Sequence, residues 1–134
     1  MVTLGLVVSR FNASVTDEMA ERARAAAEGR GAEIVETISV PGAYDTPLAA
    51  DRLARRDEID AVAVIGAIVT GETDHDQVIA RAAAAGLTEV SVERDTPVTL
   101  GITGPGMDPE QARARIGNAG TAVESAIDLA ESYQ

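Results

Sequence analysis

The chain has 134 residues, a formal net charge of −11 and no cysteine. The length suits one domain with a single ordinary core, and the lack of cysteine excludes disulfides, catalytic thiolates and thiolate metal sites. Arginine supplies all 11 basic residues, against 22 acidic ones. Nucleic-acid binding is therefore not expected, because it requires a wide basic surface.

The excess of negative charge also bears on the environment of the protein. Like charges on a surface repel one another, and salt screens that repulsion, with a Debye length of about 3 Å at 1 M. We therefore expect adaptation to a salt-rich cytoplasm; the alternative is an acidic protein of an ordinary cytoplasm. The first residues lack the pattern of a signal peptide. The longest apolar run, 61–69, is too short to span a bilayer, so a cytoplasmic location is expected.

Apolar runs alternate along the chain with polar stretches of helical character. Near-continuous apolar runs are typical of parallel strands that are covered on both faces. The predicted strands are 3–9, 32–40, 61–69, 89–94 and 97–103. The predicted helices are 16–31, 48–57, 74–85 and one that begins at 108.

Capping residues mark two of the predicted helix ends. Gly86 is expected to end the third helix. Asp108, Pro109 and Gln111 have the spacing of a capping box with proline at the first helical position. The segment 117–120, GNAG, is expected to kink the last helix.

This alternation predicts an α/β fold, a single-domain three-layer sandwich over 1–134 with a flavodoxin-like parallel sheet and helices on both faces. In such folds ligands bind outside the carboxyl ends of the strands. The loops at those ends are therefore the places to look for a site: 9–12, 40–47, 66–76 and 99–106.

The first two of these loops carry groups that suit a flat, polar ligand. Phe11, the only phenylalanine, can stack on a heterocycle, as aromatic side chains stack on bases; a core position is the alternative. Pro41 and Gly42 bend the chain after the second strand. Asp45 can accept hydrogen bonds from a polyol or from the edge of an amide ring, or it can cap the helix that follows.

The third loop holds the only histidine of the chain, His75. Thr73 is placed to cap the next helix, whose free N–H groups suit an anion. His75 can relay a proton near a bound ligand; otherwise it is a surface histidine on an acidic helix. No metal site is expected, because one histidine and scattered carboxylates do not form a ligand set.

Five stretches together resemble the 6,7-dimethyl-8-ribityllumazine synthase family, in that family's order and spacing. They are RFN at 10–12, VPGAYDTP at 40–47, GAIVTGETDH at 66–75, PVTLGIT at 97–103 and EQARAR...GNAG at 110–120. The resemblance implies the penultimate step of riboflavin biosynthesis. A ribitylaminouracil condenses with 3,4-dihydroxy-2-butanone 4-phosphate to form 6,7-dimethyl-8-ribityllumazine, and neither cofactor nor metal takes part.

The resemblance also implies a role for each matching residue. His75 is expected to be the proton donor or relay, and Phe11 to stack on the pyrimidine. The other expected substrate contacts are Ala43, Tyr44 and Asp45 with the ribityl chain and ring edge, Ala67, Ile68 and Val69 along the ring, and Glu72, Thr73 and Arg115 with the phosphate. Leu100 and Arg115 are expected to come from a neighbouring subunit of a homo-oligomer, whose basic ring is a pentamer.

The chain departs from the family's common pattern at four positions. Thr70 stands where arginine is frequent, Asp76 and Leu100 where an aromatic is usual, and Ala119 where lysine is frequent. These departures are expected to weaken substrate binding without abolishing activity, because Phe11 remains, as do His75 and Arg115.

Two alternatives remain beside this prediction. A non-catalytic flavodoxin-like module that carries a flavin or a ribityl ligand could use the same crevice. The related archaeal riboflavin synthase is a lesser alternative, because GETDH at 71–75 fits the lumazine enzyme better. A receiver domain is set aside, because Gly66 and Ala67 stand where its aspartate would be and lysine is absent.

Overall fold

The computed structural model of the chain describes residues 1–69 and 75–133. Its centre is a four-stranded sheet in the order β2-β1-β3-β4, and every strand pair is parallel. The strands are β1 (Thr3–Ser9), β2 (Glu33–Val40), β3 (Ala61–Val69) and β4 (Val98–Met107). The helices are α1 (Ala13–Gly29), α2 (Thr46–Ala54), α3 (His75–Arg94), α4 (Pro109–Ala114), α5 (Asn118–Ser132) and the 3₁₀ turn η1 (Ala43–Asp45).

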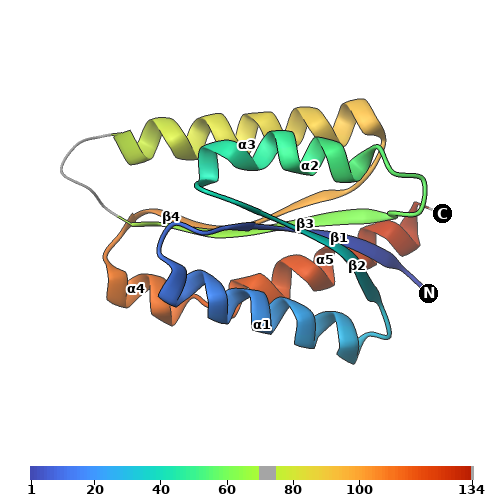
Figure 1. Cartoon of the computed structure of the whole chain (residues 1–134), viewed down its shortest axis with the longest axis horizontal. Helices are drawn as coiled ribbons and strands as arrows, with labels where there is room; N and C mark the ends of the chain where they lie inside the picture. The colour runs from blue at the N-terminus through green and yellow to red at the C-terminus, as the bar shows by residue number, and fades with distance from the viewer. Residues whose placement is uncertain (70–74, 134) are drawn as a thin grey trace.

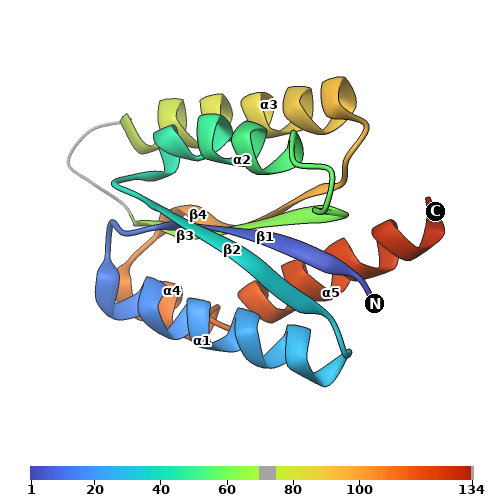
Figure 2. The same cartoon turned by 45° about the vertical axis from the view of Figure 1, so that its right-hand side comes forward.

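Helices cover both faces of the sheet, which confirms the predicted parallel α/β architecture. Figure 1 shows α2 and α3 on one face and α1, α4 and α5 on the other. The same layers are clear after a 45° turn (Figure 2). None of the described helices combines the length and the apolar character needed to cross a membrane.

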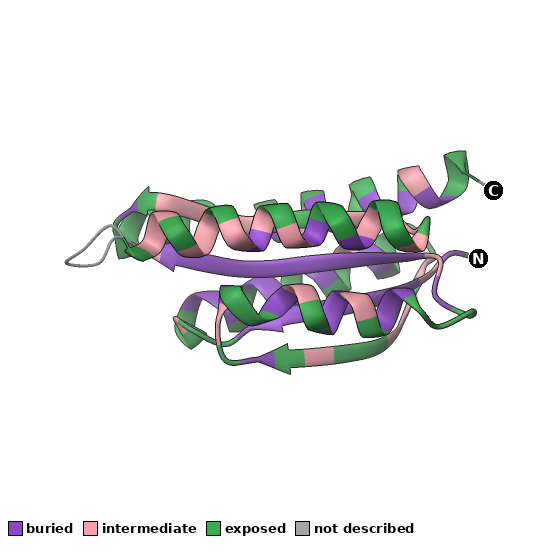
Figure 3. Ribbon diagram, turned by 90° about the horizontal axis from the view of Figure 1, so that it is seen from above, coloured by how far each residue is buried: buried purple, intermediate pink, exposed green. Residues whose placement is uncertain are grey.

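The core consists of two apolar clusters, one on each side of the sheet. Successive side chains of a strand point to opposite faces, so β3 supplies Ala63 and Ile65 to one cluster and Val62 and Val64 to the other. Eight of the nine residues of β3 are buried. The edge strand β2 is mostly exposed or half-buried, and the contrast is visible in Figure 3.

The predicted strand at 89–94 is wrong, because these residues form the last part of α3. The valines at 90 and 92 alternate as in a strand, but Val92 is exposed while Val90 is buried. Ala83, Leu87 and Val90 are the buried residues of α3, and their spacing of four and three is helical.

Gly86 lies inside α3 rather than at its end, which corrects a second prediction. A Cβ atom at this position would stand 2.8 Å from Cγ of Pro47. The glycine is therefore needed for the close approach of α3 to α2, and it is not a helix-ending signal.

The remaining differences concern the ends of helices and of β4, which runs to Met107 rather than to the predicted 103. α1 begins at Ala13 and α2 at Thr46, earlier than the predicted 16 and 48. The predicted capping box is confirmed: Asp108 accepts the Gln111 N–H at 2.8 Å, and Gln111 Oε1 accepts the Asp108 N–H at 3.0 Å. The predicted kink is also confirmed, as a break between α4 and α5.

Candidate active site

A cavity of about 500 Å³ opens at the carboxyl edge of the sheet, on the side covered by α2 and α3. This is the edge where ligands bind in parallel α/β folds. The loops after β1 and β2, the end of β3 and the first turns of α3 line it. Its lining residues are Phe11, Gly42, Ala43, Tyr44, Ala67, Ile68, Val69, His75, Asp76 and Ile79.

The loop after β1 presents Phe11 to the cavity. The side chain of Phe11 is 62% exposed, so the core alternative for this residue is wrong. Asn12 follows in the left-handed conformation, with φ 65° and ψ 53°. Its Nδ2 donates to the carbonyl oxygen of Ala67 at 3.3 Å, and this hydrogen bond joins the Phe11 loop to the end of β3.

The loop after β2 presents Tyr44, which is 65% exposed, beside the buried Ala43. Asp45 does not line the cavity with them. Its Oδ2 accepts the N–H of Gly42 at 3.0 Å, and its side chain makes no capping hydrogen bond to α2. Asp45 therefore stabilises the turn that carries Tyr44 and does not cap α2, and its expected contact with the substrate stays a prediction.

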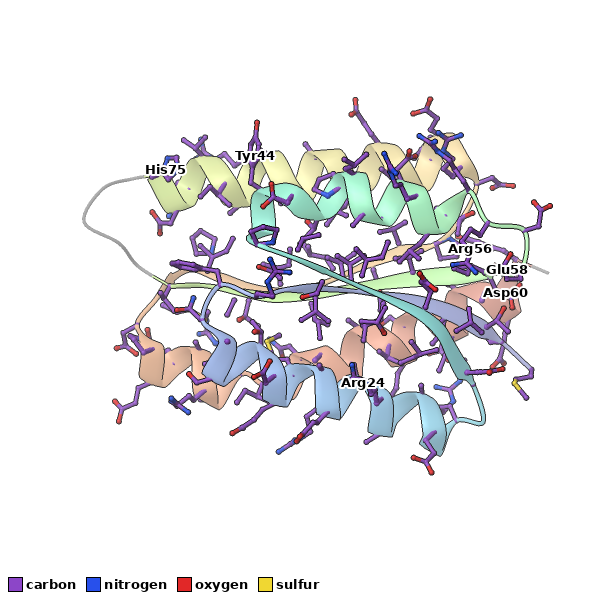
Figure 4. The ribbon with its side chains drawn as sticks, viewed as in Figure 1. Arg24, Tyr44, Arg56, Glu58, Asp60 and His75 are labelled. Atoms are coloured by element: carbon purple, nitrogen blue, oxygen red, sulfur yellow. The ribbon has the colours of Figure 1, made fainter. Side chains whose placement is uncertain are left out.

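The end of β3 and the start of α3 form the opposite wall. Ala67 and Ile68 are buried and Val69 is half-buried. His75 is the first residue of α3 and is exposed. Figure 4 shows His75 and Tyr44 toward the same end of the molecule, whereas Arg56 lies toward the other end.

Several predicted positions fall outside the described residues. They are Thr70, Glu72 and Thr73, together with the expected helix cap at Thr73. Within residues 1–69 and 75–133, no three His, Cys, Asp or Glu side chains gather in an arrangement that could hold a metal ion.

Leu100 and Arg115 lie away from the cavity lining of their own chain. Leu100 projects from the edge strand β4 and is 55% exposed. Arg115 is exposed at the end of α4. Ala119 stands where lysine is frequent in the family, and its presence was expected to remove a cation near the phosphate. Its side chain is fully buried in the core on the side of the sheet covered by α1 and α5. The side chain at 119 thus packs the subunit interior.

The sequence model of 6,7-dimethyl-8-ribityllumazine synthase matches residues 1–134. The chain belongs to the 6,7-dimethyl-8-ribityllumazine synthase family. It is 67% identical over 131 residues to the lumazine synthase of Halorubrum lacusprofundi and 63% identical over 131 residues to that of Halobacterium salinarum, with 98% of each chain covered. The lumazine synthase of Methanosarcina barkeri is 48% identical over 128 residues, with 96% of each chain covered.

Four residues at this cavity were not predicted as site residues from the sequence, and one of them is Gly42 in the loop after β2. Asp76 and Ile79 line the cavity from α3, and Asn12 fixes the Phe11 loop. A helical spacing of three to four residues places 75, 76 and 79 on neighbouring parts of one helix surface, so the predicted helix held the necessary signal. No pattern in the sequence indicated the left-handed backbone of Asn12, apart from the tolerance of asparagine for that conformation.

Proposed function

We propose that this chain catalyses the family reaction, the condensation of 5-amino-6-(D-ribitylamino)uracil with 3,4-dihydroxy-2-butanone 4-phosphate to 6,7-dimethyl-8-ribityllumazine, in the penultimate step of riboflavin biosynthesis. The observation that carries the proposal is the shared cavity of Phe11, the end of β3 and His75, in a chain that the family model matches throughout. We place the enzyme in the cytoplasm.

The cavity suits the uracil substrate. An exposed aromatic ring at its mouth offers a stacking surface, since stacking on aromatic side chains tolerates any flat base. The apolar walls of Ala67, Ile68 and Val69 exclude water from the ring. Tyr44 supplies a hydroxyl and Asp45 a carboxylate within the same turn, and both groups suit the ribityl chain.

The chemistry needs mainly positioning and a few proton transfers. An amine that is held against a ketone reacts without further activation, and correct placement of two substrates supplies much of the rate enhancement. Loss of phosphate and ring closure require proton transfers, for which one imidazole, that of His75, suffices.

The phosphate requires a second copy of the chain. Among the described lining residues of the cavity there is no arginine, while Arg115 is exposed outside it. A guanidinium binds phosphate bidentately. Leu100 and Arg115 of one copy therefore complete the cavity of the next, with Glu72 and Thr73 offering backbone N–H groups. Such head-to-tail contacts close into rings, and we propose a pentamer.

The test is the condensation itself, with purified protein in concentrated KCl, both substrates and lumazine formation followed by absorbance. The expected rate exceeds the spontaneous background and scales with protein. His75→Ala should slow turnover by less than the roughly 10²–10⁴-fold usual for acid–base residues, because positioning dominates. Bound ribityl ligand without turnover, in folded and oligomeric protein, would contradict the proposal and favour the carrier module.

A further inference from the structure

Asp76 places a carboxylate in the wall of the cavity. It is half-buried in the first turn of α3 and lines the cavity beside His75. Most other described lining residues are apolar or aromatic. Its negative charge therefore acts on any charged ligand in the cavity, and because the side chain is half-exposed, dissolved salt can screen that interaction.

The position of Asp76 also alters the field of the helix. The amino end of an α-helix carries a partial positive charge that attracts anions such as phosphate. A carboxylate in the first turn offsets that charge. An anionic ligand at this end of α3 thus meets less attraction than a bare helix terminus would offer.

We propose that Asp76 is a specificity-determining residue that weakens binding of the anionic butanone phosphate and leaves the uncharged ribitylaminouracil unaffected. The inference rests on the proposed function. The repulsion is strongest at low ionic strength and disappears in concentrated salt, because the Debye length falls from about 10 Å at 0.1 M to about 3 Å at 1 M. Asp76 therefore makes affinity for the phosphate substrate, and for that substrate alone, depend on salt.

Glu89 offers a matched control on the same helix. It is exposed and thirteen residues beyond Asp76, which corresponds to about 20 Å along an α-helix. That separation exceeds the Debye length of about 10 Å at 0.1 M. Asp76→Asn and Glu89→Gln remove the same charge from the molecule, but only the first removes it from the cavity.

The experiment measures KM for each substrate in both variants and in the unmodified enzyme. Measurements start at the lowest KCl concentration at which circular dichroism shows folded protein and end in concentrated KCl. We expect Asp76→Asn to lower KM for the phosphate substrate roughly three- to tenfold at the lowest KCl concentration. In concentrated KCl the substitution should have no effect on this KM. Glu89→Gln should change the KM of neither substrate. KM for the uracil substrate monitors the integrity of the cavity.

The outcomes separate this inference from the proposed function. An equal response of both variants would assign the effect to net charge and overturn the role of Asp76. A higher KM for the phosphate substrate in Asp76→Asn, or a parallel change for both substrates, would also overturn it. Absence of turnover in the unmodified, folded enzyme would instead overturn the proposed function on which the inference rests.

Discussion

Asn12 holds the first site loop in a conformation that most residues avoid. Its backbone is left-handed, a state that costs a residue with a branched or bulky side chain about 1–3 kcal/mol. Its carbonyl oxygen accepts the N–H groups of Val15 and Thr16 at the start of α1, and its amide donates to Ala67. One residue thus fixes both the direction of α1 and the place of Phe11.

Replacement of Asn12 should therefore change substrate binding through Phe11. We expect Asn12→Ala to raise KM for the uracil substrate several-fold and to lower the free energy of unfolding by about 1–3 kcal/mol. Asn12→Gly tolerates the left-handed backbone and loses only the hydrogen bond, so its loss of stability should be smaller. Steady-state kinetics and denaturant unfolding measure the two effects. An unchanged KM in Asn12→Ala would show that Phe11 is positioned without it.

At the scale of elements, Asp51 links α2, the helix to which it belongs, to the end of α3. Its carboxylate accepts from Arg94 Nε at 2.7 Å and from an Arg55 side-chain nitrogen at 2.5 Å. The hydrogen bonds from Arg94 and Arg55 hold the pKa of the Asp51 carboxyl below its usual value. The side chain of Asp51 is only 15% exposed, so solvent screens these interactions less than it screens a surface pair.

The lowered pKa gives the contribution of Asp51 a defined pH dependence. A carboxyl with a lower pKa in the folded state stabilises the fold above its unfolded pKa, about 3.9, and this contribution is lost as the pH falls through the folded pKa. Asp51→Asn should lower the free energy of unfolding by about 1–3 kcal/mol at neutral pH, and the difference should shrink below about pH 4. Denaturant unfolding at several pH values measures it.

A matched variant separates this effect from a general change in charge. Asp57 is exposed in the turn after α2, and Asp57→Asn removes the same charge. It should leave stability nearly unchanged, as surface substitutions usually do. Equal losses in the two variants, or a loss in Asp51→Asn that persists at low pH, would show that the ion pair with Arg94 is not the cause.

The elements that were predicted correctly from the sequence are those in which one pattern of apolar residues dominates. β1 and β3 agree with the predicted 3–9 and 61–69, because fully covered parallel strands are continuous apolar runs. The end of α3 was predicted wrongly because Val90 and Val92 alternate locally, and only packing on α2 shows which of them is buried. Contacts between helices, such as Gly86 against Pro47, are not visible in local periodicity.

The candidate site was predictable as far as it lies in one chain. The rule that ligands bind at the carboxyl edge of a parallel sheet led to the loops after β1 and β2 and to the described residues on either side of 70–74, which do meet at one cavity, with Phe11, Tyr44 and His75 in its lining. Asp45 Oδ2 accepts the N–H of Gly42 within its own turn, a structural role that the sequence alone did not reveal. Asp76 was noted only as a departure from the family pattern.

At the scale of the whole molecule, we propose that two copies of the chain share one site. The cavity residues include Phe11, whereas Arg115 lies exposed elsewhere on the chain. A variant that lacks Phe11 still carries Arg115, and the reverse holds for a variant that lacks Arg115. A mixed ring of the two variants therefore contains some sites with both residues intact, which neither pure ring contains.

Subunit mixing tests this claim most directly. Phe11→Ala and Arg115→Ala are each assayed with both substrates below their KM values, then mixed in equal amounts, dissociated, reassembled and assayed again. Each variant alone should be nearly inactive. Random mixing in a ring should restore native composition at about one site in four, with activity in proportion. No gain over the separate variants, in mixed oligomers that have demonstrably exchanged subunits, would contradict a site shared between neighbouring copies.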